Sequence, residues 1–515
     1  MMTCDLGRRS FLKGALGAAG VGGGLLHPWL RALASYPPCS PTTAVWGDLP
    51  APPTGQPPIW AAPRDLKILE IHLYGGISPW ETFYVRPPTS TDRYRGFTHE
   101  VDTAPWGTCD NLTDPEPAPF GTAGGAPVYW SRFTKPLWSS AILSKTRVVV
   151  LKHDLLPHEA AIPYAMTGLP LGRPNLAGLG AYIQHRANEF DLACGTSQGV
   201  PYSYVCWPSS FNFPFDNLQA SAAIGTHPGS SRPLVLSVGA DATAFINGLA
   251  RPGITSQFND LLNQYRGQYR DQLRSPHLAN ARTRSKGFDA YDYSAESLQS
   301  SSALRTLLQG SPLASPVRTD TPCPEYFMGA PHENIPGHAI RLAGYLLSQP
   351  GPRYICVIDG GLNAHPMGGG YDTHSSSHID YTASNLWNVL RTLRELIDNG
   401  TITLANTLIV LTTEFGRTPT RNTDGRDHWP DGYVNVLIGG PVTRGISGAI
   451  QDGGAADGVA VSTDHYSPTD LRAAILVAAG INPFVNEGFN LRDVTVGGGT
   501  HYEACINLKQ RVLGA

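Results

Sequence analysis

The chain has 515 residues, of which 41% are hydrophobic and 15% charged, so it holds ample apolar material for a large core. Its formal net charge is −3 and its basic residues are not clustered, which excludes the electrostatic pattern of a nucleic-acid-binding protein. We expect one main domain with long ordered loops, because 56 glycines and 44 prolines interrupt the chain.

The N-terminus has the pattern of an export signal. Paired arginines, Arg8 and Arg9, precede a weakly hydrophobic run over residues 14–26, and Ala32-Leu33-Ala34 is the expected cleavage site. This pattern predicts a twin-arginine signal over residues 1–34, export by the twin-arginine machinery, and a periplasmic or extracellular protein. The alternative is a membrane anchor, but the run is rich in glycine and shorter than the roughly 18 residues of a span, so we expect no stable membrane span.

Removal of the signal leaves seven cysteines in an oxidising compartment. Cys194 and Cys206 flank a loop rich in glycine, serine and proline, which predicts a disulfide between them. Cys356 lies within an apolar run and is predicted to be a free, buried thiol.

The first half of the folded domain is predicted from apolar runs. Residues 35–64 are rich in proline and are expected to form an arm, and the domain is expected to cover residues 65–515. The runs 66–73 and 146–151 predict strands, whereas residues 85–140 are expected to be mostly loop. Helices are expected from His158 to Thr167 and over residues 175–189.

From about residue 190 to 330 the pattern loosens and predicts a loop-rich cap insertion. Within it we expect a strand at 234–238 and helices near 254–273 and 295–308. Closed by the predicted disulfide, this cap would lie beside the strand ends and shape which substrate enters.

The core pattern then resumes as alternating strands and helices. Strands are predicted at 354–358, 408–411 and 433–438, and helices at 337–348, 386–397 and 468–479. Strand, polar loop, helix and strand in succession predict an α/β fold with a doubly wound, mostly parallel sheet flanked by helices.

Carboxylates and histidines follow several of these strands. Because ligands bind at the carboxyl ends of parallel strands, we expect these side chains to converge. Carboxylates offset the charge of a cation and neutral imidazoles bind it, so the set predicts one or two divalent ions, zinc, calcium or manganese. The predicted metal ligands are Glu81, Asp372, His374, Glu414, Asp427 and His428.

Three motifs carry a resemblance to a known family. Thr413-Glu-Phe-Gly-Arg-Thr-Pro and Gly425-Arg-Asp-His-Trp-Pro, preceded by Gly370-Tyr-Asp-Thr-His374, closely resemble the twin-arginine-exported bacterial family called domain of unknown function 1501. The resemblance covers roughly residues 65–510. That family looks like a branch of the alkaline phosphatase and sulfatase superfamily, which implies an alkaline phosphatase-like fold but no settled reaction.

The resemblance also implies roles for single residues. Asp372, His374 and His428 resemble the superfamily's metal ligands, and Glu414 stands where it often has the aspartate of an Asp-His pair. The segment from His158 to Gly168 is shaped like the nucleophile helix of sulfatases, with histidine in place of cysteine or serine. Cys206-Trp-Pro-Ser-Ser210 nearly matches the sulfatase motif, but it lacks the arginine and lies in the expected insertion.

These features predict an exported, metal-dependent hydrolase of an anionic ester, phosphate or sulfate. Arg417 and Arg426 would clamp the anionic oxygens of a small ester substrate. His158 or Thr82 would be the nucleophile, or His158 would act as a general base toward water.

Each assignment has a structural alternative. Glu414 could hold Arg417 and Arg426 in an ion-pair network, Asp372 could cap the next helix, and His158 could be a helix-start residue. The alternative for the whole protein is a non-catalytic exported binding or scaffolding protein that retains the fold. Histidine at position 158 favours that alternative, whereas the cluster of acids and histidines opposes it.

Overall fold

The protein is described here from a computed structural model. The expected signal peptide, residues 35–46 of the arm and part of the expected insertion lie outside the described residues. The structure describes residues 47–61, 66–86, 118–170, 178–194, 202–209, 233–249, 256–273, 300–320, 332–362, 370–374, 376–420, 425–452, 457–485 and 488–515.

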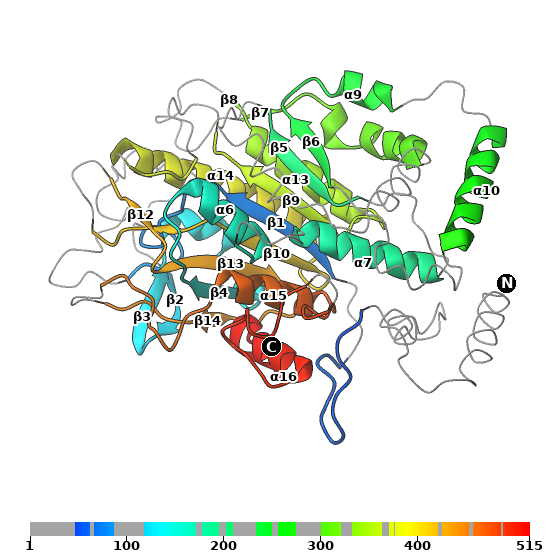
Figure 1. Cartoon of the computed structure of the whole chain (residues 1–515). Coiled ribbons are helices and arrows are strands. Elements are labelled where there is room, and N and C mark those ends of the chain that lie inside the picture. The colour runs from blue at the N-terminus through cyan, green and yellow to red at the C-terminus, as the bar shows by residue number, and fades with distance from the viewer. Residues whose placement is uncertain are drawn as a thin grey trace.

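An eight-stranded sheet forms the centre of the molecule (Figure 1). Its strand order is β14-β4-β13-β10-β1-β9-β5-β6, and β13 alone among these eight strands runs against the others. The fold is therefore α/β with a mostly parallel sheet, as predicted. The strands are β1 (Lys67–Leu73), β4 (Thr146–Leu151), β5 (Tyr204–Pro208), β6 (Leu234–Val238), β9 (Tyr354–Asp359), β10 (Thr407–Thr412), β13 (Tyr433–Gly439) and β14 (Gly445–Ser447).

Helices cover both faces of this sheet, so its central strands are buried on both sides. Uninterrupted apolar runs suit such strands, and all six residues of β10 are buried. Helices α13 (Ile335–Ser348) and α14 (Ser376–Asp398) pack on one face. Helices α6 (His158–Thr167), α7 (Leu179–Cys194) and α15 (Pro468–Ala478) pack on the other.

Local sequence explains where these helices begin and end. Ser467 and Asp470 form a capping box at the start of α15, with Pro468 in its first turn. Helix α6 ends at Gly168, which adopts the left-handed conformation that glycine tolerates best. The predicted strands at 66–73, 146–151, 234–238, 354–358, 408–411 and 433–438 are confirmed to within two residues at each end.

A hairpin lies where loop was predicted. Strands β2 (Ala118–Ala123) and β3 (Ala126–Trp130) are antiparallel and are joined by Gly124 and Gly125, both with positive φ. The expectation of mostly loop over residues 85–140 was therefore wrong for this part. A Gly-Gly pair between two short runs is a hairpin signal, because both turn positions need positive φ.

The predicted Cys194–Cys206 disulfide is also wrong. Cys206 is a free, fully buried thiol in β5, one strand away from the free Cys356 of β9. The prediction failed because β5 and β6 belong to the central sheet, so this part of the expected insertion is core. Cys356 is free and buried, as predicted.

The N-terminal arm is tied to the C-terminal helices. Trp60 Nε1 donates to the Val477 carbonyl at 2.8 Å, and Tyr502 Oη donates to the Pro57 carbonyl at 2.6 Å. The helix of Tyr502, α16 (His501–Asn507), belongs to the same hydrophobic core cluster as α15. In the described part of the chain, no helix combines the length and the apolar character that crossing a membrane requires.

Candidate metal centre

The candidate site lies where β1 and β10 end side by side, since His72 is paired with Thr412 in the parallel register. Glu414 follows β10, and His158 is the first residue of α6. His428 lies in β12 (His428–Trp429), which pairs with β11 (Gly416–Arg417). Asp372 and His374 precede α14, so four separate segments bring acid and imidazole groups together.

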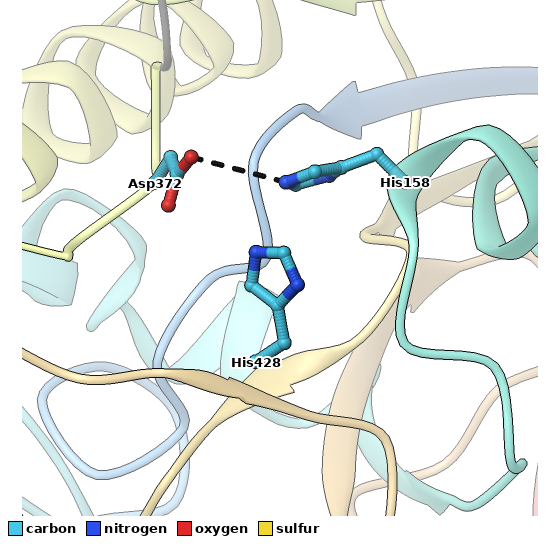
Figure 2. A group of neighbouring side chains, drawn as sticks. All are labelled: His158, Asp372 and His428. Atoms are coloured by element: carbon cyan, nitrogen blue, oxygen red, sulfur yellow. Dashed lines mark ion pairs between the residues drawn. The ribbon is translucent and has the colours of Figure 1, made fainter.

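Three side chains form the centre of the site: His158, Asp372 and His428 (Figure 2). One ligand atom from each lies within 4.8 Å of the others, and His158 Nε2 lies 3.8 Å from Asp372 Oδ2. All three are partly buried, so the group is shielded but reachable. The sequence placed each of these residues at the site, and the fold brings them together.

Glu414 fixes the ring of His158 through its Nδ1 atom. Its carboxylate is fully buried and accepts hydrogen bonds from His158 Nδ1 at 2.8 Å and from the Gly75 amide at 2.9 Å. Burial raises the pKa of Glu414, but the hydrogen bond and charge of His158, together with His72, outweigh burial and lower it to about 2. Glu414 is therefore ionised and can only accept, so Nδ1 of His158 carries a proton.

His428 is oriented in the same way by a backbone group. Its Nδ1 lies 2.9 Å from the carbonyl oxygen of Leu156, which can only accept a hydrogen bond, so Nδ1 carries the proton. Burial, followed by the charges of Arg417 and His158, lowers the pKa of His428 to about 4. A neutral ring results, with its lone pair on Nε2.

Both imidazoles thus have Nδ1 anchored to an acceptor and Nε2 facing Asp372 and its neighbours. Metal-binding histidines usually show this arrangement, in which a carboxylate or carbonyl fixes the ring and raises the basicity of the other nitrogen. Two imidazoles and one carboxylate fit Zn²⁺ or Mn²⁺ better than Ca²⁺, which prefers an all-oxygen shell.

His374 and Asp427 extend the group toward solvent. His374 Nε2 lies 3.1 Å from both Asp372 Oδ1 and His428 Nε2, while its Nδ1 lies 3.4 Å from Asp427 Oδ1. Since His428 Nε2 and the carboxylate both accept, a proton or a cation must lie between them and His374. His374 has a 46% exposed side chain and Asp427 a 64% exposed one, so they form the outer edge of the site.

Arg417 is buried and fully engaged within the protein. Its Nε donates to the Gly76 carbonyl at 2.9 Å and its Nη1 to the Arg426 carbonyl at 3.1 Å. Its Nη2 contacts the Gly75 carbonyl and the Asp372 carboxylate, with which it forms an ion pair. Arg417 therefore positions Asp372 and two loops, and its remaining N–H group, on Nη1, lies 3.4 Å from His374 Nε2.

Arg426 and Glu81 form a second buried pair. Arg426 Nε lies 2.6 Å from Glu81 Oε1, and its Nη1 donates to the carbonyls of Thr418 and Pro419. Thr82 is buried, and its hydroxyl donates to the Ser78 carbonyl at 2.6 Å. These partners hold Glu81, Thr82 and Arg426 apart from the three grouped ligand atoms.

Two histidines that support the site were not predicted. His153 is buried, accepts from the Leu155 amide at 3.1 Å and donates to the Glu414 carbonyl at 2.7 Å, which fixes the loop before His158. His72 Nε2 lies 3.5 Å from Glu414 Oε2. The signal for His72 was its place two residues after Glu70 in a mostly apolar strand, because residues at this spacing share one face of the sheet.

Comparison with known proteins adds one relationship. Residues 257–501 match the family described as "Protein of unknown function (DUF1501)", and no curated protein matches the chain. His158 lies outside the matched residues, whereas Asp372, Glu414 and His428 lie within them. The match agrees with the resemblance of the motifs at 370–374, 413–419 and 425–430, which lie within the matched residues.

Proposed function

We propose that this protein is an exported, metal-dependent hydrolase of an anionic ester, phosphate or sulfate. The observation that carries the proposal is the convergence of His158, Asp372 and His428 with both imidazoles anchored through Nδ1. A binding surface has no need for two imidazoles whose lone pairs are fixed toward one point, whereas a metal centre does.

The residues divide into holding and supporting roles. His158, His428 and Asp372 would hold one divalent ion, and Glu414 and the Leu156 carbonyl would keep the two rings in place. Such an ion polarises an ester and lowers the pKa of water beside it. His374, the most exposed imidazole of the group, would take up or release a proton at Nε2.

The arginines receive a different role from the one that the sequence suggested. Arg417 and Arg426 are buried and engaged with carboxylates and backbone carbonyls, so we propose that they position Asp372 and the loops. The bound ion, together with His374, would then balance the charge of the substrate. An alkaline phosphatase-like fold is proposed on the same motifs.

Metal analysis tests the proposal. The purified, folded protein should bind one Zn²⁺ per chain and hydrolyse at least one member of a panel of aryl phosphate and aryl sulfate esters. His158→Ala and Asp372→Asn should each lower Zn²⁺ affinity and turnover by at least about tenfold. His465→Ala is a matched control, since His465 bonds to the Val461 carbonyl outside the group.

The competing function is a non-catalytic exported binding or scaffolding protein. Tight Zn²⁺ binding without hydrolysis of any ester in the panel would favour that alternative. Failure of the unaltered protein to bind Zn²⁺ or Mn²⁺ would remove the basis of the hydrolase proposal.

We also propose export by the twin-arginine pathway. The paired residues Arg8 and Arg9 support it, and they lie outside the described part of the chain. Replacing both by lysine should leave the protein in the cytoplasm with its signal uncleaved, whereas Lys13→Arg should be exported. Periplasmic recovery of the double variant in cell fractionation would contradict the proposal.

A further inference from the structure

Phe415 is a buried aromatic residue that contacts both imidazoles of the metal centre. Its side chain is fully buried. The centroid of its ring lies 4.3 Å from that of His428 and 4.8 Å from that of His158, and the two imidazole centroids lie 4.5 Å apart. Each of the three rings therefore contacts the other two.

The backbone of Gly76 limits where the ring of Phe415 can lie. A Cβ atom on Gly76 would lie 2.5 Å from Cε2 and 2.6 Å from Cδ2 of Phe415, so the backbone approaches the ring as closely as only glycine permits. The carbonyl of Gly76 accepts a hydrogen bond from Arg417 Nε at 2.9 Å. The ring is therefore packed against a backbone segment that is itself held in place.

The two imidazoles need a second support besides the hydrogen bond that each makes at Nδ1. That bond alone leaves the plane of an imidazole free to tilt, because hydrogen bonds tolerate a broad range of acceptor angles. Such a tilt would move Nε2 of His158 or His428 away from the point that both share with Asp372. The interplanar angles with the Phe415 ring are 47° for His158 and 33° for His428, so each imidazole turns a face partly toward the phenyl ring. This contact blocks the tilt in that direction.

Phe415 also completes a short run that supports all three grouped residues. Glu414 bonds to Nδ1 of His158, Phe415 contacts both imidazoles, and Arg417 pairs with Asp372. A phenyl ring carries no polar atom, so it can support the imidazoles without competing for the ion that they would bind.

We infer that Phe415 is a positioning residue whose ring sets the planes of His158 and His428 and thereby directs both Nε2 atoms toward one ion. This inference rests on the proposed function and deepens it, because it names a residue that sets the affinity of the site for its metal without touching the metal.

Phe415→Leu and Phe415→Met test the inference, because both keep the position apolar but lack the flat ring. Competition with a chromogenic chelator should show Zn²⁺ binding weakened by at least about tenfold in both variants, the size typical of losing a group that supports a ligand. The visible absorption of bound Co²⁺, which reports the geometry of the ligands, should change as well. Phe120→Leu is the matched control: Phe120 of β2 is also buried, its ring stacks on Trp130 at 4.5 Å, and its loss should leave Zn²⁺ affinity unchanged.

A substitution at Gly76 approaches the same ring from the backbone. Gly76→Ala should weaken Zn²⁺ binding too, since its Cβ would displace the ring of Phe415. Unchanged Zn²⁺ affinity and an unchanged Co²⁺ spectrum in Phe415→Leu, while His428→Ala loses affinity, would overturn the inference. Equal losses of affinity in Phe415→Leu and Phe120→Leu would also overturn it, because the effect would then come from loosened packing in general. Failure of the unaltered protein to bind either ion would instead count against the proposed function, on which the inference depends.

Discussion

Two groups of charged side chains lie on the same sheet. The central group surrounds Glu70 of β1, and the group at the edge lies at the carboxyl ends of β1 and β10. In the central group, Arg472 of α15 donates from Nη1 and Nη2 to the two oxygens of Glu70, each at 2.6 Å. The hydroxyls of Tyr354 and Thr412 donate to the same carboxylate at 2.5 and 2.9 Å. In this group, both oxygens of the carboxylate are satisfied inside the protein.

The group at the edge is built from histidines and carboxylates. Glu414 and the Leu156 carbonyl satisfy one nitrogen of each imidazole, whereas Nε2 of His158 and Nε2 of His428 face Asp372 across distances suited to an ion. The difference teaches that burial and charge alone do not mark a site. A site is marked by atoms that are held in place while their lone pairs stay available.

The largest expected effect comes from breaking the central pair. Arg472→Met should lower the free energy of unfolding by about 3–5 kcal/mol, because Glu70 would remain buried without its cation. Denaturant unfolding measures this loss. The double variant Glu70→Leu/Arg472→Met should recover most of it, since no charge is then left unpaired. A double variant as unstable as the single one would show that the pair is needed for more than charge balance.

A substitution in the edge group should lower the affinity for Zn²⁺ and leave the free energy of unfolding nearly unchanged. His428→Ala should weaken Zn²⁺ binding by at least about tenfold, as expected for loss of a ligand. Its free energy of unfolding without metal should change by no more than about 1 kcal/mol, because the ring is only partly buried. Calorimetric titration and urea unfolding of the same sample measure both. A large loss of stability with unchanged Zn²⁺ affinity would show that His428 supports the fold and does not bind the ion.

The pH dependence of stability gives a finer test of His428. Its pKa in the fold, about 4, lies below the ordinary value of 6.5, so the unfolded chain binds more protons between these values. The contribution of the neutral ring is present above pH 6.5 and is lost as the pH falls toward 4. The metal-free protein should therefore lose stability over this range faster than His428→Gln. Parallel curves for the two proteins would contradict the assigned neutral state.

The smallest effect is expected at a solvent-exposed ion pair that resembles the central one in chemistry. Arg394 Nε lies 2.6 Å from Asp398 Oδ2, one turn along α14, and the two side chains are 36% and 56% exposed. Asp398→Ala should change the free energy of unfolding by no more than about 0.5 kcal/mol, because water screens the pair. A loss comparable to that of Arg472→Met would show that burial does not explain why the Arg472–Glu70 pair stabilises the fold more than the Arg394–Asp398 pair.

Much of the fold could be predicted from the sequence. Strands such as β4 and β10 contain uninterrupted apolar runs, and the amphipathic spacing of α14 is equally clear, so local pattern alone locates them. Strand β5 was missed because Cys206-Trp-Pro reads as a loop motif, although Pro208 stands at the last position of the strand. Whether this segment forms a strand depends on its burial in the sheet, which is a tertiary effect.

The site could be predicted in part. Asp372 follows β9 and His158 begins α6, so their approach at the carboxyl ends of the strands follows from topology, whereas His428 reaches the site from the separate β11-β12 hairpin. The sequence does not show which group an arginine binds. Arg417 and Arg426 form ion pairs with Asp372 and Glu81 of the protein itself. The role of His153 could not be predicted, because nothing in the sequence shows that the Glu414 carbonyl lies within its reach.

The central claim is that His158, Asp372 and His428 hold one ion. Anomalous diffraction from crystals of the Zn²⁺-loaded protein tests it most directly. The account predicts a single strong peak at bonding distance, about 2.0–2.2 Å, from His158 Nε2, His428 Nε2 and a carboxylate oxygen of Asp372. A peak elsewhere in the molecule, with these three side chains unchanged and unligated, would contradict it.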